Sequence, residues 1–388
     1  MRLPLLSLIL AAGLLAGCAH QPPVLAPQPL ADAGAAIERF IAQRQLPGAA
    51  LWIERAGQGS YHRAYGQRAV DPAPEPLDET TVFDAASLTK PVVTATLVQL
   101  LRERGQLDVE APLQRYLPDC GGVDKAGITL RHLLTHSSGL PSGLPRSGPT
   151  GDWTGQAGAE RTACALAPTA APGTLFRYSD VNFILLGRII ERQAGMPLER
   201  FAEQALFKPL GMADSGYLPL QRIAAARIAP TERQPDGHVL RGEVHDPTAR
   251  RMGGVAGHAG LFTTTADLAR FARMLLAGGV AEDGRRLLSP ASVALLTTPQ
   301  SPPELAEKRG MGWDIASPYA RPRGSLYSDT SYGHTGFTGC VLWLDPTSRS
   351  FYVLLSNRVH PAAGTNVLPL YGELGTLAAK AVGIAPAR

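Results

Sequence analysis

The sequence predicts a mixed α/β fold of the α+β type, with one antiparallel sheet built from both chain ends and flanked by helices. Strand-like runs occur near the start, at residues 48–57 and 59–70, and again near the end, at residues 331–346 and 350–359. Between them, from about residue 115 to 225, glycine and proline interrupt a series of helical patterns. We therefore expect an inserted, mostly helical subdomain. The chain has 388 residues, of which 45% are hydrophobic, which is enough for one large core with such an insertion.

The predicted elements follow one another in a simple order. The first is a helix that starts near residue 35, because Ile37, Phe40 and Ile41 fall on one helical stripe. A hairpin follows, since a glycine-rich turn separates the first two strand-like runs. Further helical patterns occupy residues 81–107, 129–140, 182–195, 198–212, 263–279 and about 366–383.

The N-terminus predicts export. Arg2 precedes an apolar run over residues 3–15, which is too short to span a membrane and is typical of a signal peptide. The sequence LAGC that ends at Cys18 resembles a bacterial lipobox, although an ordinary signal peptide with an incidental cysteine is the alternative. Ala19, rather than an aspartate, resembles outer-membrane sorting. We expect a lipid anchor on Cys18 that holds a periplasm-facing lipoprotein in the outer membrane of a Gram-negative bacterium.

These signals divide the chain into three parts. Residues 1–18 are expected to be the lipoprotein signal peptide. Residues 19–33 are rich in proline and lack periodicity, so they predict a tether between the anchor and the folded part. Residues 34–385 are then the folded domain.

Composition and cysteine content limit the partners and the cross-links. The formal charge is only +4 and no basic run with interleaved aromatic residues occurs, so nucleic-acid binding has no support. In an oxidising compartment, Cys120 and Cys164 could pair because both lie in loop-like segments, but the sequence equally allows no disulfide. Cys340 lies in an apolar strand-like run and is expected to pack in the core. No pattern predicts the oligomeric state.

Ser87 and Lys90 are the first candidates for chemistry, in the segment AASLTKPVV at residues 85–93. Residues three apart lie on one face of a helix, and Pro91 is tolerated only near a helix start, so both should lie in the first turn. Lysine can lose its proton, whereas arginine cannot. We expect the helix dipole and burial to lower the pKa of Lys90, so that the neutral amine takes the proton of Ser87. The alternative is a capped helix whose lysine reaches solvent.

Two later segments provide further candidates. RYSDVNF places Tyr178 and Asp180 before an apolar helix, and a tyrosine can exchange a proton with a nucleophile. GHTGFTG places His334, Thr335 and Gly336 at the start of an apolar strand, where glycine lets a substrate backbone approach closely. Alternatively, these residues are an ordinary helix start and a turn.

In this order, the three motifs resemble the signature of the serine β-lactamase and penicillin-binding-protein superfamily, which combines Ser-x-x-Lys with a Lys-Thr-Gly-type strand. The tyrosine in the middle motif resembles the branch of class C β-lactamases, D,D-peptidases and related esterases. Similar segments are LTHSSGL at 134–140, GGVAGHAGLFTTTADLARF at 253–271, MGWDI at 311–315 and LLSNRVHP at 354–361. The resemblance covers residues 35 to 385 and implies a β-lactamase/transpeptidase-like fold without a cofactor.

The resemblance also implies roles. Ser87 would be the nucleophile of an acyl-enzyme, Lys90 its base partner, and Tyr178 the group that assists proton transfer to the leaving group. Either Lys90 or Tyr178 could be the general base. The backbone N–H groups of Ser87 and Phe337 would form the oxyanion hole. The remaining substrate-contact positions would be Asp180, His334, Thr335 and Gly336, with His334 and Thr335 on a substrate carboxylate.

Two residues depart from the β-lactamase pattern. Asp180 stands where those enzymes usually have asparagine, and an ionised carboxylate cannot donate a hydrogen to an acyl carbonyl. Asn182 is close in sequence but two positions away. His334 replaces lysine and is only partly charged at neutral pH, which weakens its attraction for a carboxylate. The sequence therefore favours a D-alanyl-D-alanine carboxypeptidase or endopeptidase acting on peptidoglycan peptides. The alternatives are a class C-like β-lactamase, a carboxylesterase, and a non-catalytic lipoprotein that binds penicillin or wall peptides.

The remaining histidines and aromatic residues do not predict a metal site. His132 and His136 are four residues apart, but no glutamate lies between them and no third ligand is evident. His258 lies in a glycine-rich stretch and is expected at a bend near the active-site rim. Trp313 and Phe337 could line a substrate cleft or pack in the core.

Overall fold

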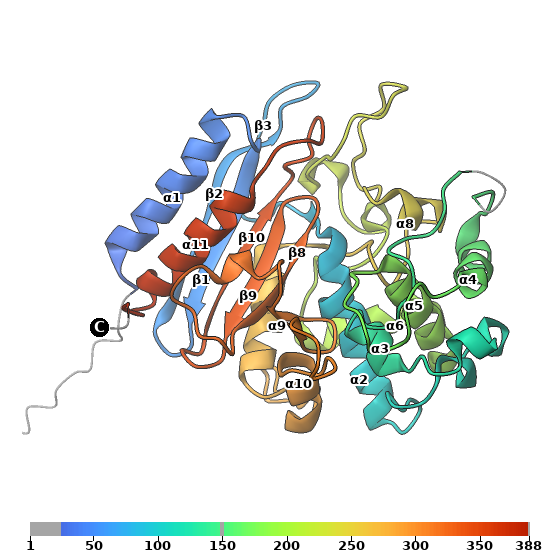
Figure 1. Cartoon of the computed structure of the whole chain (residues 1–388). Coiled ribbons are helices and arrows are strands. Elements are labelled where there is room, and N and C mark those ends of the chain that lie inside the picture. Colours follow the sequence, from blue (N-terminus) through green and yellow to red (C-terminus); the bar gives the residue numbers. More distant parts are fainter. Residues whose placement is uncertain (1–24, 148–150, 387–388) are drawn as a thin grey trace, which may run out of the picture.

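The computed structural model describes residues 25–147 and 151–386. The strands are Gly48–Arg55 (β1), Gly59–Ala69 (β2), Glu75–Pro76 (β3), Phe83–Asp84 (β4), Phe262–Thr263 (β5), Lys308–Arg309 (β6), Asp314–Ala316 (β7), Tyr332–Gly336 (β8), Cys340–Asp345 (β9) and Ser350–Ser356 (β10). Within the described residues, eight of them form one antiparallel sheet in the order β3-β2-β1-β10-β9-β8-β7-β6 (Figure 1). The sheet joins both chain ends through the β1–β10 pair, which confirms the predicted fold class.

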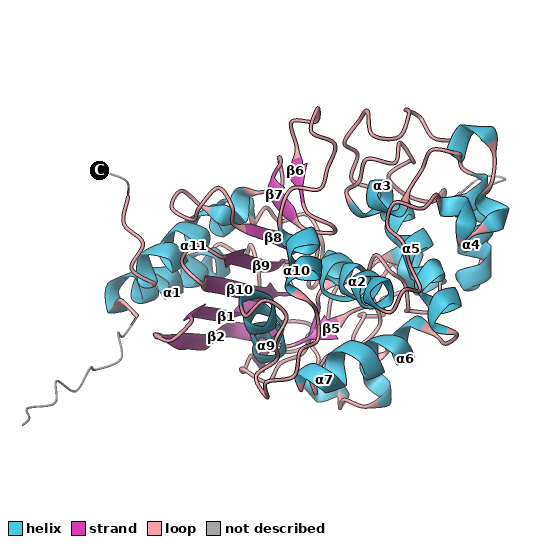
Figure 2. Ribbon diagram, turned by 90° about the horizontal axis from the view of Figure 1, so that it is seen from below, coloured by secondary structure: helices cyan, strands magenta, loops and turns pink. Residues whose placement is uncertain are grey.

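Helices cover the sheet and form a second region beside it. Their bounds are Pro27–Ala42 (α1), Thr96–Glu103 (α2), Leu130–Leu134 (α3), Gly155–Ala165 (α4), Asp180–Ala194 (α5), Leu198–Ala202 (α6), Lys208–Leu210 (α7), Pro247–Arg251 (α8), Thr265–Leu276 (α9), Pro290–Thr297 (α10) and Leu368–Ala381 (α11). Helices α1 and α11 lie side by side on one face of the sheet, and α9 packs against β1, β9 and β10 (Figures 1 and 2). Helices α2 to α6 gather on the other side of the molecule from α1 and α11 (Figure 2).

Two hydrophobic clusters hold these layers together. One lies between the sheet and the α1–α11 pair, where Ile37, Leu354 and Leu374 pack. The other joins the opposite face of the sheet to the helical region, where Leu355, Phe271 and Leu185 pack. Because the central strand β10 is covered on both faces, all of its residues are buried. The sheet and the helical region thus share one hydrophobic core, and this packing holds the residues between them in place.

The N-terminal boundary of the domain differs from the sequence prediction. Helix α1 begins at Pro27, not near residue 35, and Leu25 is only 5% exposed, so residues 25–33 of the predicted tether belong to the folded part. Proline is well tolerated at a helix start, and small residues such as Ala33 let the helix lie close to the sheet. The proline content alone was therefore misleading. Cys18 and the rest of residues 1–24 lie outside the described part of the chain.

The helical region lies between strands β4 and β5 in the chain. Helical elements continue beyond residue 225 to α8, and the two-stranded pair of β4 and β5 connects this region to the chain on either side. Cys120 and Cys164 form a disulfide within it, and Cys340 is a buried free thiol. In the described residues, every helix falls short of the length and apolar character that a membrane span needs.

Candidate active site

Ser87 lies in a tight turn at the end of strand β4. Ala86 adopts a φ of 47°, which is strained for a residue with a side chain, and its N–H donates to Asp84 Oδ1 at 2.8 Å. A short 3₁₀ turn over Ala86–Leu88 then leads into a π-helical segment, Lys90–Ala95, and on into α2. The sequence predicted a single regular helix here. The spacing argument nevertheless holds, because Lys90 Nζ lies 3.0 Å from Ser87 Oγ.

Lys90 is fully buried and surrounded by acceptors. Its Nζ contacts Ser87 Oγ at 3.0 Å, the backbone carbonyl of His258 at 3.0 Å and Asp180 Oδ1 at 2.7 Å. Burial opposes the charge, but Asp180 outweighs it and raises the pKa of Lys90 above its ordinary value. The expectation that this pKa is lowered was wrong, because the sequence did not reveal that Asp180 would become the ion partner.

Tyr178 lies against the same ammonium group. The centre of its ring is 4.9 Å from Lys90 Nζ. Burial raises the pKa of Tyr178, against the opposing effect of Lys90, so the phenol is protonated at neutral pH. The ring of His136 packs 4.5 Å from that of Tyr178, and the backbone N–H of Ser179 donates to His136 Nδ1 at 3.1 Å. His136 therefore supports Tyr178 from behind.

Asp180 and Asn182 occupy different environments on α5. Asp180 stands at the start of the helix, where Ser179 is the N-cap, and its carboxylate pairs with Lys90. The sequence placed Asp180 among the substrate contacts, whereas the structure shows it as the counterion of Lys90. Asn182 is buried, accepts a hydrogen bond from Ser138 Oγ at 2.7 Å, and is not among the residues that line the cavity beside Ser87.

His258 and Asp246 complete the surroundings of Lys90. Besides the carbonyl that accepts from Lys90, His258 has its Nε2 2.9 Å from Asp246 Oδ1. Asp246 is also the N-cap of α8, accepting from Ala249 N at 2.7 Å. His258 outweighs the effect of burial and holds the pKa of Asp246 well below its usual range. The sequence placed His258 only at a bend and did not find Asp246 at all, since the two are twelve residues apart and form no motif.

Asp180, Asp246 and His258 lie close together. Each offers one atom that could bind a metal, and these three atoms all lie within 4.8 Å of one another. Two carboxylates and a histidine are residue types that metal sites use. Here the Lys90 ammonium already contacts Asp180 and provides a positive charge to this group. The histidine pair considered from the sequence does not converge on a ligand: His132 joins the capping box of α3 with Thr129.

Strand β8 lies directly against the turn that carries Ser87. A Cβ atom at Gly336 would come within 2.4 Å of the carbonyl oxygen of Ala85, so this close approach requires glycine. Ser87 and Phe337 consequently line the same cavity. The backbone of Phe337, which follows Gly336, is thereby held beside Ser87. An oxyanion formed by attack of the serine would lie next to this backbone.

His334 is not a cation in this site. Its Nδ1 lies 2.8 Å from the carbonyl oxygen of Thr335, so Nδ1 carries the proton and Nε2 is left as an acceptor. Burial, followed by the nearby charges of Arg309 and Lys90, lowers the pKa of His334 well below its ordinary value. The sequence predicted a partly charged histidine at neutral pH, whereas this site makes it neutral.

A different residue brings positive charge to the cavity beside Ser87. The cavity has a volume of about 170 Å³ and is lined by Ser87, Tyr178, Arg309, Asp314, Tyr319, His334, Thr335 and Phe337. Arg309, on strand β6, is only 1% exposed, and within the described part of the chain its Nε and Nη2 have no hydrogen-bond partner. Its Nη1 lies 3.5 Å from Asp314 Oδ1. Buried donors without partners are rare in proteins, so these two nitrogens are available to an acceptor on a ligand that enters the cavity.

The sequence missed Arg309. The segment MGWDI was noted for its resemblance, but the arginine two residues before it carried no signal of its own. Of the two aromatic residues considered there, Phe337 lines the cavity and is 57% exposed, whereas Trp313 is fully buried in the core.

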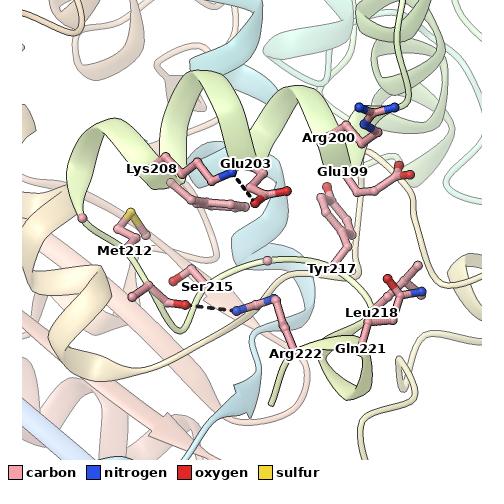
Figure 3. A pocket seen from close by; sticks show the side chains of 14 residues that line it. Glu199, Arg200, Glu203, Lys208, Met212, Ser215, Tyr217, Leu218, Gln221 and Arg222 are labelled. Carbon is pink, nitrogen blue, oxygen red and sulfur yellow. Dashed lines mark hydrogen bonds and ion pairs between the residues drawn. The ribbon is translucent and has the colours of Figure 1, made fainter.

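A larger cavity of about 600 Å³ lies elsewhere, along α6, α7 and the loop over residues 211–222 (Figure 3). Lys208 pairs there with Glu203 at 2.8 Å, and Arg222 donates to the backbone carbonyl of Ala213 at 3.1 Å (Figure 3). It contains none of the motif residues. We therefore place the candidate active site at Ser87, where a hydroxyl, an amine and a phenol converge in a way that can support nucleophilic catalysis.

Comparison with known proteins identifies the family. The beta-lactamase family model matches residues 33–374. A protein of Escherichia coli strain K12 named "Putative D-alanyl-D-alanine carboxypeptidase" is 33% identical over 379 residues, covering 88% of this chain and 86% of that protein. An N-acetylmuramyl-L-alanine amidase of Bacillus subtilis strain 168 is also 33% identical, covering 84% of this chain and 80% of that protein. Among solved structures, EstCE1, a hydrolase with promiscuous acyltransferase activity, superposes with a TM-score of 0.70 at 21% identity, covering 90% of this chain and 98% of that one.

Proposed function

Because the chain belongs to the beta-lactamase family, a family of hydrolases, we propose that it is a serine D-alanyl-D-alanine carboxypeptidase that acts on peptidoglycan peptides through an acyl-enzyme on Ser87. The curated relatives support a cell-wall substrate, since their names assign them to carboxypeptidase and amidase reactions on wall components. The geometry around Ser87 supports the serine mechanism, and the cavity beside it supports the carboxypeptidase reaction.

In the proposed reaction, Ser87 Oγ attacks the carbonyl of the penultimate D-alanine. The backbone N–H groups of Ser87 and Phe337 stabilise the oxyanion, a contribution that is typically about 3–4 kcal/mol per donor. Tyr178 passes a proton to the departing amine, and the phenol form that burial favours suits this role. Water then releases the acyl group from Ser87.

The observation that carries the choice of substrate is the guanidinium of Arg309, whose Nε and Nη2 have no hydrogen-bond partner in the described residues and whose Nη1 lies 3.5 Å from Asp314 Oδ1. Arg309 lines the same small cavity as Ser87 and Tyr178, the group that we expect to protonate the leaving group. A departing D-alanine has a free carboxylate next to its amine, and arginine binds carboxylates through paired hydrogen bonds. Arg309, rather than the neutral His334, is then the cation that holds this carboxylate, with Thr335 beside it.

Two of the alternatives, an ester hydrolase and an amidase, lack a group for this cation to bind. The leaving group of a simple ester has no carboxylate. An N-acetylmuramyl-L-alanine amidase releases an alanine whose own carboxyl is joined to the next residue of a peptide. A β-lactamase and a non-catalytic binder both accept carboxylates, so they differ from a carboxypeptidase only in turnover.

The test uses the chain from Ala19 onward and a pentapeptide that ends in D-Ala-D-Ala. We expect release of one D-alanine, detected by mass spectrometry, and a rate about 100-fold lower for the same peptide with a C-terminal carboxamide, because the carboxamide has no charge for Arg309. In parallel, benzylpenicillin should leave a persistent adduct on the protein. Equal cleavage of both peptides, or rapid loss of the adduct with consumption of the drug, would contradict the carboxypeptidase assignment.

We also propose that the protein is a periplasm-facing lipoprotein anchored through Cys18 in the outer membrane. The support is the LAGC sequence alone, since the anchor lies outside the described residues. Expression with radiolabelled palmitate in a Gram-negative host should label the protein, and Cys18→Ala should remove the label and release the protein into the soluble periplasmic fraction. Unchanged labelling of Cys18→Ala would rule out this anchor.

A further inference from the structure

The contacts of Lys90 leave it unable to act as a base in the resting enzyme. An ammonium group has three N–H donors and no acceptor. Lys90 has three neighbouring acceptors, namely Ser87 Oγ, the carbonyl oxygen of His258 and Asp180 Oδ1, at 3.0, 3.0 and 2.7 Å. In this arrangement, Ser87 Oγ accepts a hydrogen bond from Lys90, whereas nucleophile activation requires the opposite direction. Lys90 must therefore lose a proton before it can accept the proton of Ser87.

The surroundings of Lys90 leave one destination for that proton. The lysine is fully buried, so its Nζ has no direct contact with solvent. A backbone carbonyl such as that of His258 does not take up a proton at ordinary pH, and Ser87 is the group to be deprotonated. Tyr178 also lies against Lys90, but burial raises its pKa and its oxygen already carries a proton. Asp180 is a carboxylate at hydrogen-bond distance, and a carboxylate can hold a proton.

From these contacts, we propose that Asp180 accepts a proton from Lys90 and so converts Lys90 into the neutral amine that deprotonates Ser87. First, the proton moves from Nζ to the Asp180 carboxylate, giving an amine and a carboxylic acid. Ser87 Oγ then bonds to the substrate carbonyl while its proton moves to Nζ. As the tetrahedral intermediate collapses, Tyr178 gives its proton to the leaving nitrogen and regains one from Lys90. The carboxylic acid of Asp180 returns its proton to Lys90, so the only net transfer is from Ser87 to the leaving group.

The groups around this pair are fixed in position. The bond between His258 Nε2 and Asp246 Oδ1 holds the residue whose carbonyl contacts Lys90, and Asp246 is itself fixed by the N-terminus of α8. These two residues are positioning residues, since they act on Lys90 through the backbone. The charged and titratable groups that face Lys90 and Asp180 from the packed elements are Tyr178, His136, Asp246, His258, Arg309 and His334.

The proposal gives a physical reason for the Tyr-Ser-Asp motif. An asparagine at position 180 could hydrogen-bond Lys90 but could not take up its proton. With aspartate, the proton moves within the pair, from the buried lysine to a carboxylate that is 33% exposed, and no exchange with solvent is needed. The proposal rests on Ser87 being the nucleophile of the proposed function, but it does not depend on which substrate the enzyme cleaves.

The test measures covalent labelling of Ser87 by a fluorophosphonate probe from pH 6 to 9, which needs serine deprotonation but no natural substrate. For the wild-type protein, we expect a rate that is flat over this range, because the proton is exchanged inside the pair. In Asp180→Asn, burial lowers the pKa of Lys90 without the opposing effect of Asp180, but asparagine cannot take up the proton, so Lys90 must lose it to solvent. The rate should fall about 100-fold at pH 7, as for loss of a general base, and then rise about tenfold per pH unit.

Two variants serve as controls. Asp180→Glu retains a carboxylate and should restore the flat profile, which a loss of folding would not allow. Asp152→Asn removes a carboxylate that is 97% exposed and should match the wild type.

Three outcomes would overturn the proposal. If the probe labels Asp180→Asn faster than the wild type at pH 7, and the pH profile of the labelling rate moves to lower pH, the proton of Lys90 leaves to solvent in the wild type as well. If Asp180→Asn loses the same factor at every pH, Asp180 only positions Lys90. If Ser87→Ala is labelled as quickly as the wild type, the serine mechanism of the proposed function fails first, which separates that failure from a failure of the role of Asp180.

Discussion

Replacement of Ser87 by alanine is expected to abolish both peptide cleavage and the penicillin adduct, with a loss of at least about 10⁴-fold in kcat/KM. The reason is that Ser87 lines the cavity, faces Lys90 at 3.0 Å and is held by the strained turn at Ala86, so the neighbouring groups converge on its oxygen. The measurement is D-alanine release from the pentapeptide together with the intact mass of the protein after incubation with benzylpenicillin.

A matched control excludes a general effect of removing a hydroxyl group. Ser142 is exposed and contributes only its backbone carbonyl, which accepts from Asp180 N at 2.7 Å, so Ser142→Ala should behave as the wild type. The melting temperatures of both variants should stay close to that of the wild type, because neither change opens a cavity in the core. Retention of cleavage or of the adduct by Ser87→Ala would show that another residue is the nucleophile.

Replacement of Arg309 by glutamine is expected to lower kcat/KM for the D-Ala-D-Ala peptide about 100-fold, with less than about a threefold effect on p-nitrophenyl acetate. A charge-assisted hydrogen bond to a carboxylate contributes about 1.5–3 kcal/mol, and about 1.4 kcal/mol corresponds to a factor of ten. The acetate ester has no carboxylate on its leaving group, so it does not use this contact. Steady-state kinetics with both substrates measures the difference.

The control for this variant concerns Asp314. Arg309 Nη1 is 3.5 Å from Asp314 Oδ1, so the single replacement leaves a buried carboxyl without its partner. Burial raises the pKa of Asp314, and this carboxyl can take up a proton when Arg309 is absent. The double variant Arg309→Gln/Asp314→Asn removes both charges and should keep the same selectivity loss with a melting temperature nearer to that of the wild type. Equal losses of kcat/KM for the peptide and for the ester would mean that Arg309 supports the fold of the site and does not bind the substrate carboxylate.

Local patterns in the sequence determined the elements and the motifs. The hairpin of β1 and β2, the closing strands β9 and β10 and the helix α9 were predicted because periodicity, turn residues and caps act over a few neighbouring residues. The spacing of Ser87 and Lys90 was informative for the same reason, since three residues in a helical turn leave little freedom. The order of the three motifs supported the family, which the comparison with known proteins confirmed.

Contacts between distant segments were decided only by the tertiary structure. Lys90 meets Asp180 and the carbonyl of His258, which are 90 and 168 residues further along the chain, and the direction of its pKa shift depends on these neighbours. Arg309 and Asp314 reach the cavity because β6 and β7 continue the sheet next to β8, and no local pattern records that adjacency. The sequence thus determined which groups could react. The fold decided the charge of each group and which of them lie together, because electrostatic energies depend on distance and burial in space and not on separation along the chain.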